Sequence, residues 1–303
     1  MIYPWSYSQD ITTCETIEQV MEKAGLNYKV NKLPAYYKDF NGGEEFIAAD
    51  NPERPGFYLT VRADNGYALG MVGNQYKVLQ MEDVFSFLQN LKDDEGLLTW
   101  HNAGTFFGGV RAWIAARIEG QTFEIDGNEV ECWLFANNSF DGRSKVGFSL
   151  IPTIEGDAIP VIDKAKRDCE FVHKGDLEEK SRNAAKVLHV SDVYMNNVRT
   201  KMGVWSSKTI TAERFAELLF SAKDEDGDRK KENVERMREA FVAKAHEQHR
   251  KPTALDGFLV AASFANTGEL GNNRKNAEVN RLIGMADGRI ALIRNAQKVA
   301  DKV

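Results

Sequence analysis

The clearest structural signal in this chain is the segment Phe123-Glu124-Ile125-Asp126-Gly127-Asn128-Glu129-Val130. Apolar and polar residues alternate on both sides of Asp126-Gly127, which is the pattern of strands that bury one face. An Asp-Gly pair is a preferred two-residue turn between antiparallel strands, because both residues tolerate a positive φ. The segment therefore predicts a β-hairpin and an antiparallel sheet around it.

Strand-like segments continue on both sides of this hairpin. They are rich in β-branched and aromatic residues, which favour strands, and cover residues 97–102, 105–118, 130–137 and 146–151. Further upstream, Ala63-Asp64-Asn65-Gly66 is a turn between two alternating segments and predicts a second hairpin. Helical spacing of apolar residues predicts helices at 12–25 and 81–91.

After Pro152 the pattern changes to charged, alanine-containing segments of helical character, at 165–188, 191–204, 209–219, 233–249, 253–266 and 276–299. We expect an α+β protein, with an N-terminal antiparallel β-meander and packed helices followed by a C-terminal helical region. The change in pattern places a domain boundary near residue 155. This predicts a sheet domain over residues 1–155 and a helical domain over residues 156–303.

The composition is that of a globular protein of 303 residues, with 43% hydrophobic and 28% charged residues. No segment reaches the roughly 20 apolar residues of a membrane helix, and we expect no signal peptide. The three cysteines are scattered along the chain, at Cys14, Cys132 and Cys169. An odd, dispersed set favours reduced thiols and predicts a cytoplasmic protein.

The net charge of −6 is unevenly distributed. Residues 1–155 carry 12 Lys and Arg against 22 Asp and Glu, whereas residues 156–303 carry 27 against 23. This balance does not indicate a nucleic-acid-binding protein by itself, but a local basic groove matters more than the total charge. An acidic front half is also compatible with a basic protein partner.

Familiar catalytic patterns are absent from the sequence. No Gly-rich loop ends in Gly-Lys-Ser or Gly-Lys-Thr, the Rossmann spacing is missing, and no Gly-x-Ser-x-Gly segment occurs. We therefore predict no catalytic residue and no cofactor. The one candidate metal set consists of Cys169 with His173 and His246 with His249, whose spacings place each pair on one helical face. Nothing in the sequence shows that the two pairs meet, and ordinary surface positions are the alternative.

Aromatic and basic residues are interleaved in the meander. Proteins that bind single-stranded nucleic acid combine rings that stack on bases with cations that follow the backbone. We predict phosphate contacts from Lys77, Arg111, Arg143 and Lys145, and stacking by Tyr76 and Trp113. The alternative is that the rings form the core face of a half-buried sheet, and the prediction requires that rings and cations share an open face of the strands.

Three segments of the front half resemble a known family: residues 70–80, Ala103 to Trp113, and Phe140-Asp141-Gly142-Arg143-Ser144. The family is that of phage/plasmid-like proteins described as domain of unknown function 932. Weaker similarity continues through Phe171-Val172-His173 and residues 284–296. Two positions depart from the family pattern: Phe140 stands where the family usually has His, and residues 153–159 replace its Arg, Cys and Asn-Thr.

The resemblance implies a mobile-element origin and a cytosolic setting, but no established activity. The order of hairpin, helix and β-meander also resembles the core of phage single-strand annealing proteins. We therefore expect a non-enzymatic protein that binds or anneals single-stranded DNA in recombination or replication, and that forms a homo-oligomer. The alternatives are a regulatory protein that binds a host protein, and a metal-dependent enzyme that uses the cysteine and histidine pairs.

Overall fold

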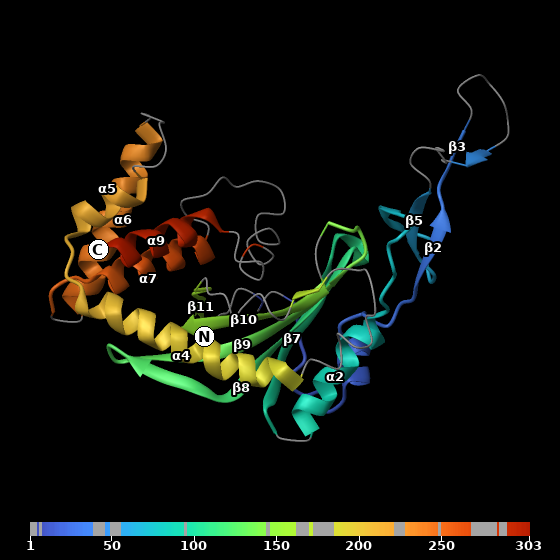
Figure 1. The fold of residues 1–303 in the computed structure, drawn as a ribbon, viewed down its shortest axis with the longest axis horizontal. Coiled ribbons are helices and arrows are strands. Elements are labelled where there is room, and N and C mark those ends of the chain that lie inside the picture. The colour runs from blue at the N-terminus through green and yellow to red at the C-terminus, as the bar shows by residue number, and fades with distance from the viewer. Residues whose placement is uncertain are drawn as a thin grey trace.

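The computed structural model describes residues 5, 8–38, 46–48, 56–93, 96–143, 146–161, 170–171, 185–220, 228–247, 250–267, 284 and 290–303. It shows an α+β protein with antiparallel sheets in the front half and most of the helices in the back half (Figure 1). This confirms the predicted fold class. Among the described residues, no helix combines the length and the apolarity needed to cross a membrane.

The main sheet is the predicted β-meander. Its strands run in the order β1-β7-β8-β9-β10-β11, with β12 also paired to β10. Their bounds are β1 Gln9–Asp10, β7 Leu98–Phe106, β8 Arg111–Ile125, β9 Asn128–Ser139, β10 Val146–Ile154, β11 Asp157–Ala158 and β12 Glu170–Phe171. The turn between β8 and β9 lies at Asp126-Gly127, as the sequence predicts. Both residues have positive φ, at 49° and 76°.

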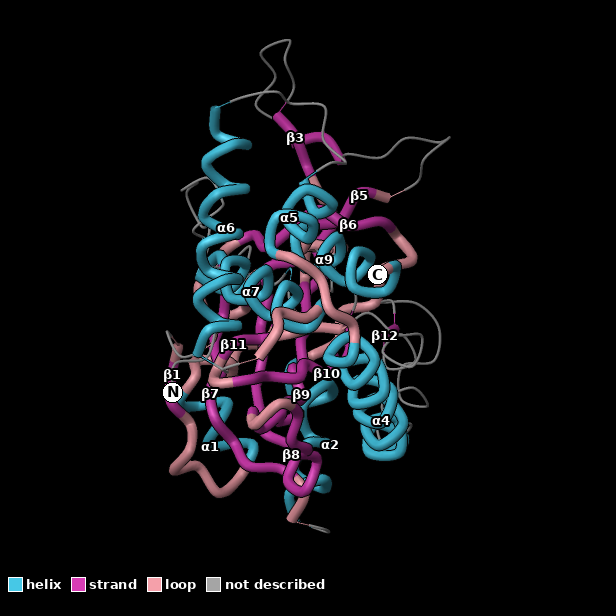
Figure 2. Tube along the Cα trace, turned by 90° about the vertical axis from the view of Figure 1, so that its left-hand side faces the viewer, coloured by secondary structure: helices cyan, strands magenta, loops and turns pink. Residues whose placement is uncertain are grey.

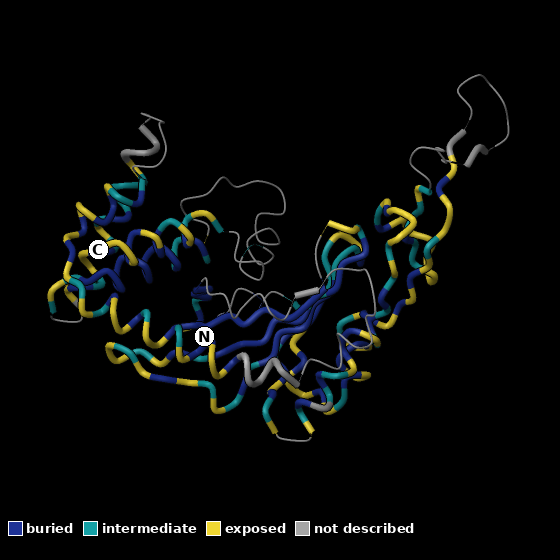
Figure 3. The backbone as a smooth tube through the Cα atoms, in the orientation of Figure 1, coloured by how far each residue is buried: buried dark blue, intermediate teal, exposed yellow. Residues whose placement is uncertain are grey.

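Both faces of the main sheet are buried, which explains why β8 and β9 read as almost continuous apolar runs. Along β8, Ala112, Ile114 and Ala116 join the main hydrophobic core. The alternating Trp113 and Ala115 point to the other side, into a smaller cluster with Trp133 and Phe135. The central strands are accordingly the most deeply buried part of the molecule (Figure 3).

Two helices that precede the meander pack near one end of it, and they are α1 Ile17–Lys23 and α2 Met81–Asp93. Helix α2 buries Val84, Phe85 and Leu88 in the main core, as its helical spacing predicts. Helix α1 starts later than the sequence predicts, because its cap is Thr16, whose hydroxyl accepts a hydrogen bond from Gln19 N. Thr12 instead donates to the Asp10 carboxylate.

A second, three-stranded sheet forms an arm that projects from the body (Figure 1). Its order is β2-β5-β6, with β2 Val30–Pro34, β5 Phe57–Arg62 and β6 Ala68–Gly73. The short pair β3 Tyr36–Lys38 and β4 Phe46–Ala48 follows β2 at the end of the arm. One face of the arm packs on the body. On that face, Thr60 Oγ1 donates a hydrogen bond of 2.7 Å to Phe140 O.

The back half contains helices α4 Ala185–Ser207, α5 Ala212–Phe220, α6 Asp228–Glu247, α7 Ala254–Thr267 and α9 Ala291–Lys302. Helix α4 contacts β8 and β10, and the other four pack together beyond one end of the sheet (Figures 1 and 2). The predicted helix over 165–188 is wrong at Glu170–Phe171, which pair with β10 as strand β12. Much of the predicted helix over 276–299 lies outside the described residues.

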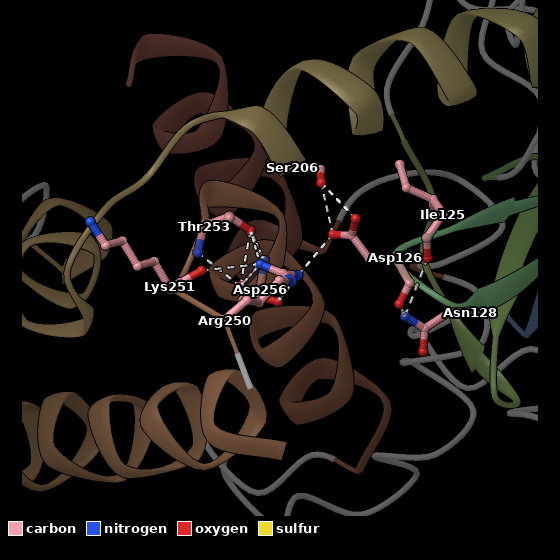
Figure 4. A network of polar contacts seen from close by, with 8 residues as sticks. All are labelled: Ile125, Asp126, Asn128, Ser206, Arg250, Lys251, Thr253 and Asp256. Atoms are coloured by element: carbon pink, nitrogen blue, oxygen red, sulfur yellow. Dashed lines mark hydrogen bonds and ion pairs between the residues drawn. The ribbon is translucent and has the colours of Figure 1, made fainter. Parts of the chain in front are cut away.

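The two halves share one core and a polar network. Residues from Ile11 to Ala300, on both sides of residue 155, belong to the same hydrophobic cluster. At the tip of the β8–β9 hairpin, the Asp126 carboxylate accepts hydrogen bonds from Arg250 Nη2 and Ser206 Oγ, each at 2.8 Å (Figure 4). The guanidinium of Arg250 also donates to the fully buried Asp256 at 2.9 and 3.0 Å.

Candidate nucleic-acid interface

Four of the six predicted site residues meet at one corner of the main sheet. Arg111 begins β8 and lies opposite Ser139, the last residue of β9. The turn of residues 140–143 follows, and β6 of the arm packs directly against it, because a Cβ on Gly70 would lie 2.5 Å from Asp141 Cα. Tyr76 reaches the same place and donates from its hydroxyl to Ser139 O at 2.7 Å. We call Tyr76, Lys77, Arg111, Ser139, Asp141 and Arg143 the corner.

Asp141 organises the corner. Its Oδ1 accepts hydrogen bonds from Ser139 Oγ at 2.6 Å and from Arg143 N at 2.9 Å, which fixes the turn. Its Oδ2 lies 3.7 Å from Arg111 Nη2. The two side chains of this ion pair are only 19% and 14% exposed. Arg111 is therefore largely neutralised by its neighbour, which corrects the expectation that it is a cation on an open face.

Tyr76 is half-buried against the same turn. Gly142 lies so close that a Cβ there would be 3.8 Å from the Tyr76 ring and 3.4 Å from Val72. Burial raises the pKa of the Tyr76 hydroxyl, and the negative charge of Asp141 adds to the rise. The hydroxyl therefore stays protonated and acts as a donor, so Tyr76 holds the corner together more than it offers a free ring.

Trp113 lies inside the protein, with only 2% of its surface exposed. Its ring stacks between Phe106 and Phe135, at centroid distances of 5.8 and 5.2 Å. Both ring faces are covered, so a base has no access to them. This corrects the expectation that Trp113 lies on an open face, and the physical reason is that both faces of the main sheet are covered.

Two of the predicted cations, Lys77 and Arg143, lie at exposed positions. Lys145 lies outside the described residues. Exposed rings near the corner come from residues that were not predicted as site residues. Phe107 is 48% exposed and Tyr67 is 64% exposed. Arg62 connects their two segments, since it donates from Nη1 to Gly108 O at 3.1 Å and from its backbone N to Tyr67 O at 2.9 Å.

A sequence signal for these rings exists but is weak. Phe107 precedes Gly108-Gly109 in a turn and has a positive φ of 55°, which forces its side chain out of the strand pattern. Tyr67 follows the predicted turn at residues 63–66. Turn residues point outward more often than strand residues do, but aromatic residues in a meander suggest the core.

Three buried polar atoms beside the corner have no hydrogen-bond partner among the residues that the structure describes: Arg111 Nε, Trp113 Nε1 and Asn137 Oδ1. Trp113 and Asn137 lie directly opposite each other, and Arg111 lies two residues from Trp113 on the same face. Leaving such an atom unbonded costs about 1–3 kcal/mol. Each of the three atoms can bond a buried water molecule.

The candidate metal residues are not brought together within the described part of the chain. Cys169, His173 and His249 lie outside it, and His246 is on an exposed position of α6. Among the described residues, no group of three or more His, Cys, Asp and Glu side chains is arranged to hold a metal ion. Cys14 and Cys132 are buried thiols.

Both positions that depart from the resembled family have structural roles. Phe140 is fully buried and packs edge-on against Tyr28, with ring centroids 6.2 Å apart. Residues 154–158 form a short hairpin of β10 and β11, turning at Glu155-Gly156 with φ of 51° and 91°. The backbone of Ala158 then exchanges two hydrogen bonds with the Asn266 amide of α7, at 3.1 and 2.9 Å.

Comparison with known proteins gives one finding. The family model "Domain of unknown function (DUF932)" matches residues 68–283, which include the corner, most of the main sheet and most of the helical half. Neither the curated proteins nor the solved structures contain a significant match to the chain. The family match confirms the resemblance carried by the segments around Tyr76, Trp113 and Arg143. The chain belongs to the DUF932 family of domains of unknown function.

Proposed function

We propose that this protein binds single-stranded nucleic acid at the corner, as a cytoplasmic protein of a phage or other mobile element that acts in recombination or replication. One observation carries the proposal. Segments far apart in the sequence bring the exposed residues Lys77 and Arg143 to one corner, and the exposed Phe107 and Tyr67 belong to neighbouring turns that Arg62 joins. Cations would contact phosphates there, and rings would stack on bases.

The expected binding is weak and depends on salt. Arg111 is paired with Asp141, so we assign the phosphate contacts to the two exposed residues Lys77 and Arg143. Each phosphate contact on a single strand contributes about −0.7 to the slope of log K against log salt, so two contacts predict a slope of roughly −1.4. Stacking on one ring adds about 1–3 kcal/mol.

The test is fluorescence anisotropy with a labelled oligonucleotide over a range of salt concentrations. The double variant Lys77→Ala/Arg143→Ala is expected to lose most of the binding and to flatten the salt dependence. Phe107→Ala is expected to weaken binding without changing the salt slope, because it removes a ring and no charge. The matched control is Lys298→Ala/Lys302→Ala, which removes two cations from α9. Equal losses in both double variants would refute the corner as the site.

A second candidate function, self-association, is favoured by the outer face of the arm. The strand register places Leu33, Leu59 and Met71 in one row across β2, β5 and β6. Phe57 and Val61 flank Leu59 on the same face. Leu33 and Met71 are 46% and 61% exposed, and Phe57 is 37% exposed. The opposite face of the arm is the one that packs on the body, so the body leaves this apolar face uncovered.

We propose that a second copy of the chain covers this face. The five side chains named above carry no charge, so two copies can meet there without repulsion, and contiguous exposed apolar surface marks interaction sites. Sedimentation equilibrium should show an oligomer whose fraction rises with protein concentration. Leu33→Glu/Met71→Glu is expected to give a monomer, while Val242→Glu, on an exposed position of α6, should leave association unchanged. A monomer at every concentration would end this candidate.

A further inference from the structure

A cleft of about 810 Å³ opens between α5 and α9, far along the chain from the corner. The segment Thr209–Thr211 closes one side of it. The volume is within the range of ligand-binding clefts in proteins. The cleft is a groove between two packed helices, and an amphipathic helix can bind in an apolar groove of this kind.

The floor of the cleft is apolar and firmly held. Ile210, Leu219 and Val299 line it, and each is at least nine-tenths buried and part of the main hydrophobic core. Such a floor cannot move away without opening the core, so the groove has a fixed shape. Leu218 also lines the cleft, and because it is only partly buried it adds apolar surface that a partner can contact.

The rim of the cleft is positively charged. Lys298 and Lys302 are four residues apart on α9 and so share one face, and Arg214 faces them from α5. The acid paired at the rim is Glu217, whose Oε2 lies 3.4 Å from Arg214 Nη1. Both side chains of this pair are more than 60% exposed, so it contributes little and leaves Arg214 able to exchange partners.

We infer that this cleft binds an acidic amphipathic helix of a protein partner. The apolar stripe of such a helix would pack on Leu218 and on the small exposed parts of the floor residues. Its carboxylates would meet Arg214, Lys298 and Lys302. A nucleic-acid strand would meet the cations but would leave the apolar floor without a matching surface. The combination of an apolar floor with a cationic rim is therefore specific for a chain that is both apolar and acidic.

The probe is a synthetic peptide of about 14 residues, long enough to form a helix, with Leu on one face and Glu beside it. Binding to the full chain is measured by anisotropy of the labelled peptide. The native protein is expected to bind it in a salt-sensitive manner and to ignore a peptide with Lys in place of every Glu. No binding of the acidic peptide at low salt would overturn the inference.

Reversing the charge of the rim provides a second test, in which a variant that loses one peptide is expected to gain the other. Lys298→Glu/Lys302→Glu should weaken binding of the acidic peptide by roughly tenfold or more, because it replaces attraction with repulsion. The same variant should gain binding of the Lys peptide. That gain shows that the variant is folded and that the contacts are direct. Loss of both peptides with an unchanged circular dichroism spectrum would contradict the inference.

A reciprocal control separates this site from the corner. Lys77→Ala/Arg143→Ala should bind the acidic peptide as the native protein does, and Lys298→Glu/Lys302→Glu should keep any oligonucleotide binding. Displacement of the peptide by an oligonucleotide would show that the cleft takes nucleic acid and would refute the inference. If the protein bound the peptide but no oligonucleotide, the proposed function would be refuted and the inference about the cleft would stand.

Discussion

Gly70 on β6 is the residue at which the arm approaches the corner most closely. A Cβ at this position would lie 2.5 Å from the Cα of Asp141 and 2.9 Å from its Cβ. These atoms belong to a turn that is fixed by three interactions of the Asp141 carboxylate, so they cannot retreat without cost. Gly73, on the same strand, has no atom within 4 Å of the corresponding position.

We therefore expect Gly70→Ala to lower the free energy of unfolding by about 1–3 kcal/mol, as overpacking does in rigid surroundings. Gly73→Ala should leave it unchanged or raise it by up to about 1 kcal/mol, because alanine restricts the unfolded chain. Urea denaturation of both variants checks the pair. Equal stability of the two variants would mean that the arm is free to move away from the corner.

The residues predicted at the interface differ in exposure according to whether they lie within a strand or after it. Those that follow a strand, Lys77 and Arg143, are exposed, whereas Trp113 within β8 is sealed between two rings. The alternation of residues along β8 correctly predicts which side chains share a face of the strand. It cannot show that other residues of the chain cover the second face. Arg111 is neutralised by a residue thirty positions away, which no local pattern reveals.

At the scale of elements, the contact of α5 with α7 depends on a glycine inside a helix. A Cβ on Gly257 would lie 2.6 to 2.7 Å from three ring atoms of Phe215, and that ring is fully buried against Phe241. Glycine normally costs a helix about 1 kcal/mol relative to alanine. Here the absence of a side chain permits a close approach of two helices.

Gly257→Ala is accordingly expected to destabilise the protein by about 1–2 kcal/mol, because the cost of overpacking exceeds the gain in helix propensity. Gly203→Ala on α4 is the matched control, since nothing lies within 4 Å of its Cβ position. It should stabilise the protein by about 0.5–1 kcal/mol. The midpoint temperature of thermal unfolding should fall in Gly257→Ala and rise in Gly203→Ala. A shift in the same direction in both variants would contradict this explanation.

The β11 strand carries a pH-sensitive carboxyl. Burial raises the pKa of Asp157, while a hydrogen bond with Ser263 and the charge of Lys244 oppose the rise. The folded protein thus holds this proton more tightly than the unfolded chain does. The stability contributed by the protonated carboxyl is present below the unfolded pKa and is lost as the pH rises through the folded pKa.

Asp157→Asn cannot ionise and should escape this loss. Its free energy of unfolding is expected to exceed that of the native protein at pH 7, and the difference should shrink toward the ordinary Asp pKa of about 3.9. Denaturant titrations at several pH values measure the difference. Glu213→Gln, at an exposed position of α5, should show no such trend. A constant difference between Asp157→Asn and the native protein would assign the effect to packing.

At the scale of the whole molecule, the tip of the β8–β9 hairpin is tied to the helical half through Asp126. Its carboxylate accepts from Arg250 and Ser206, which belong to segments 124 and 80 residues away. Asp126→Asn keeps a residue that tolerates the positive φ of 49° but removes the charge. We expect faster amide hydrogen exchange at residues 123–130 and a loss of about 1–2 kcal/mol of stability.

Glu129→Gln is the control for this prediction, because it changes an exposed carboxylate of the same hairpin. Its exchange pattern should match that of the native protein. If Asp126→Asn also exchanged at the native rate, the hairpin would be held by packing alone. A further increase in exchange at α7 in Asp126→Asn would show that the network couples the sheet to the helices.

The α+β class, the order of hairpins and helices and the turn at Asp126-Gly127 can be predicted from the sequence, because they follow from local periodicity and turn chemistry. The family resemblance, which lies in the segments that form the corner, is also a property of the sequence. The three-dimensional packing is needed to see which rings and cations reach the surface, where the arm leaves an apolar face uncovered, and that a cationic cleft lies between α5 and α9. Those properties depend on contacts between residues distant in the chain, and the free energy of burial and ion pairing is set by such contacts.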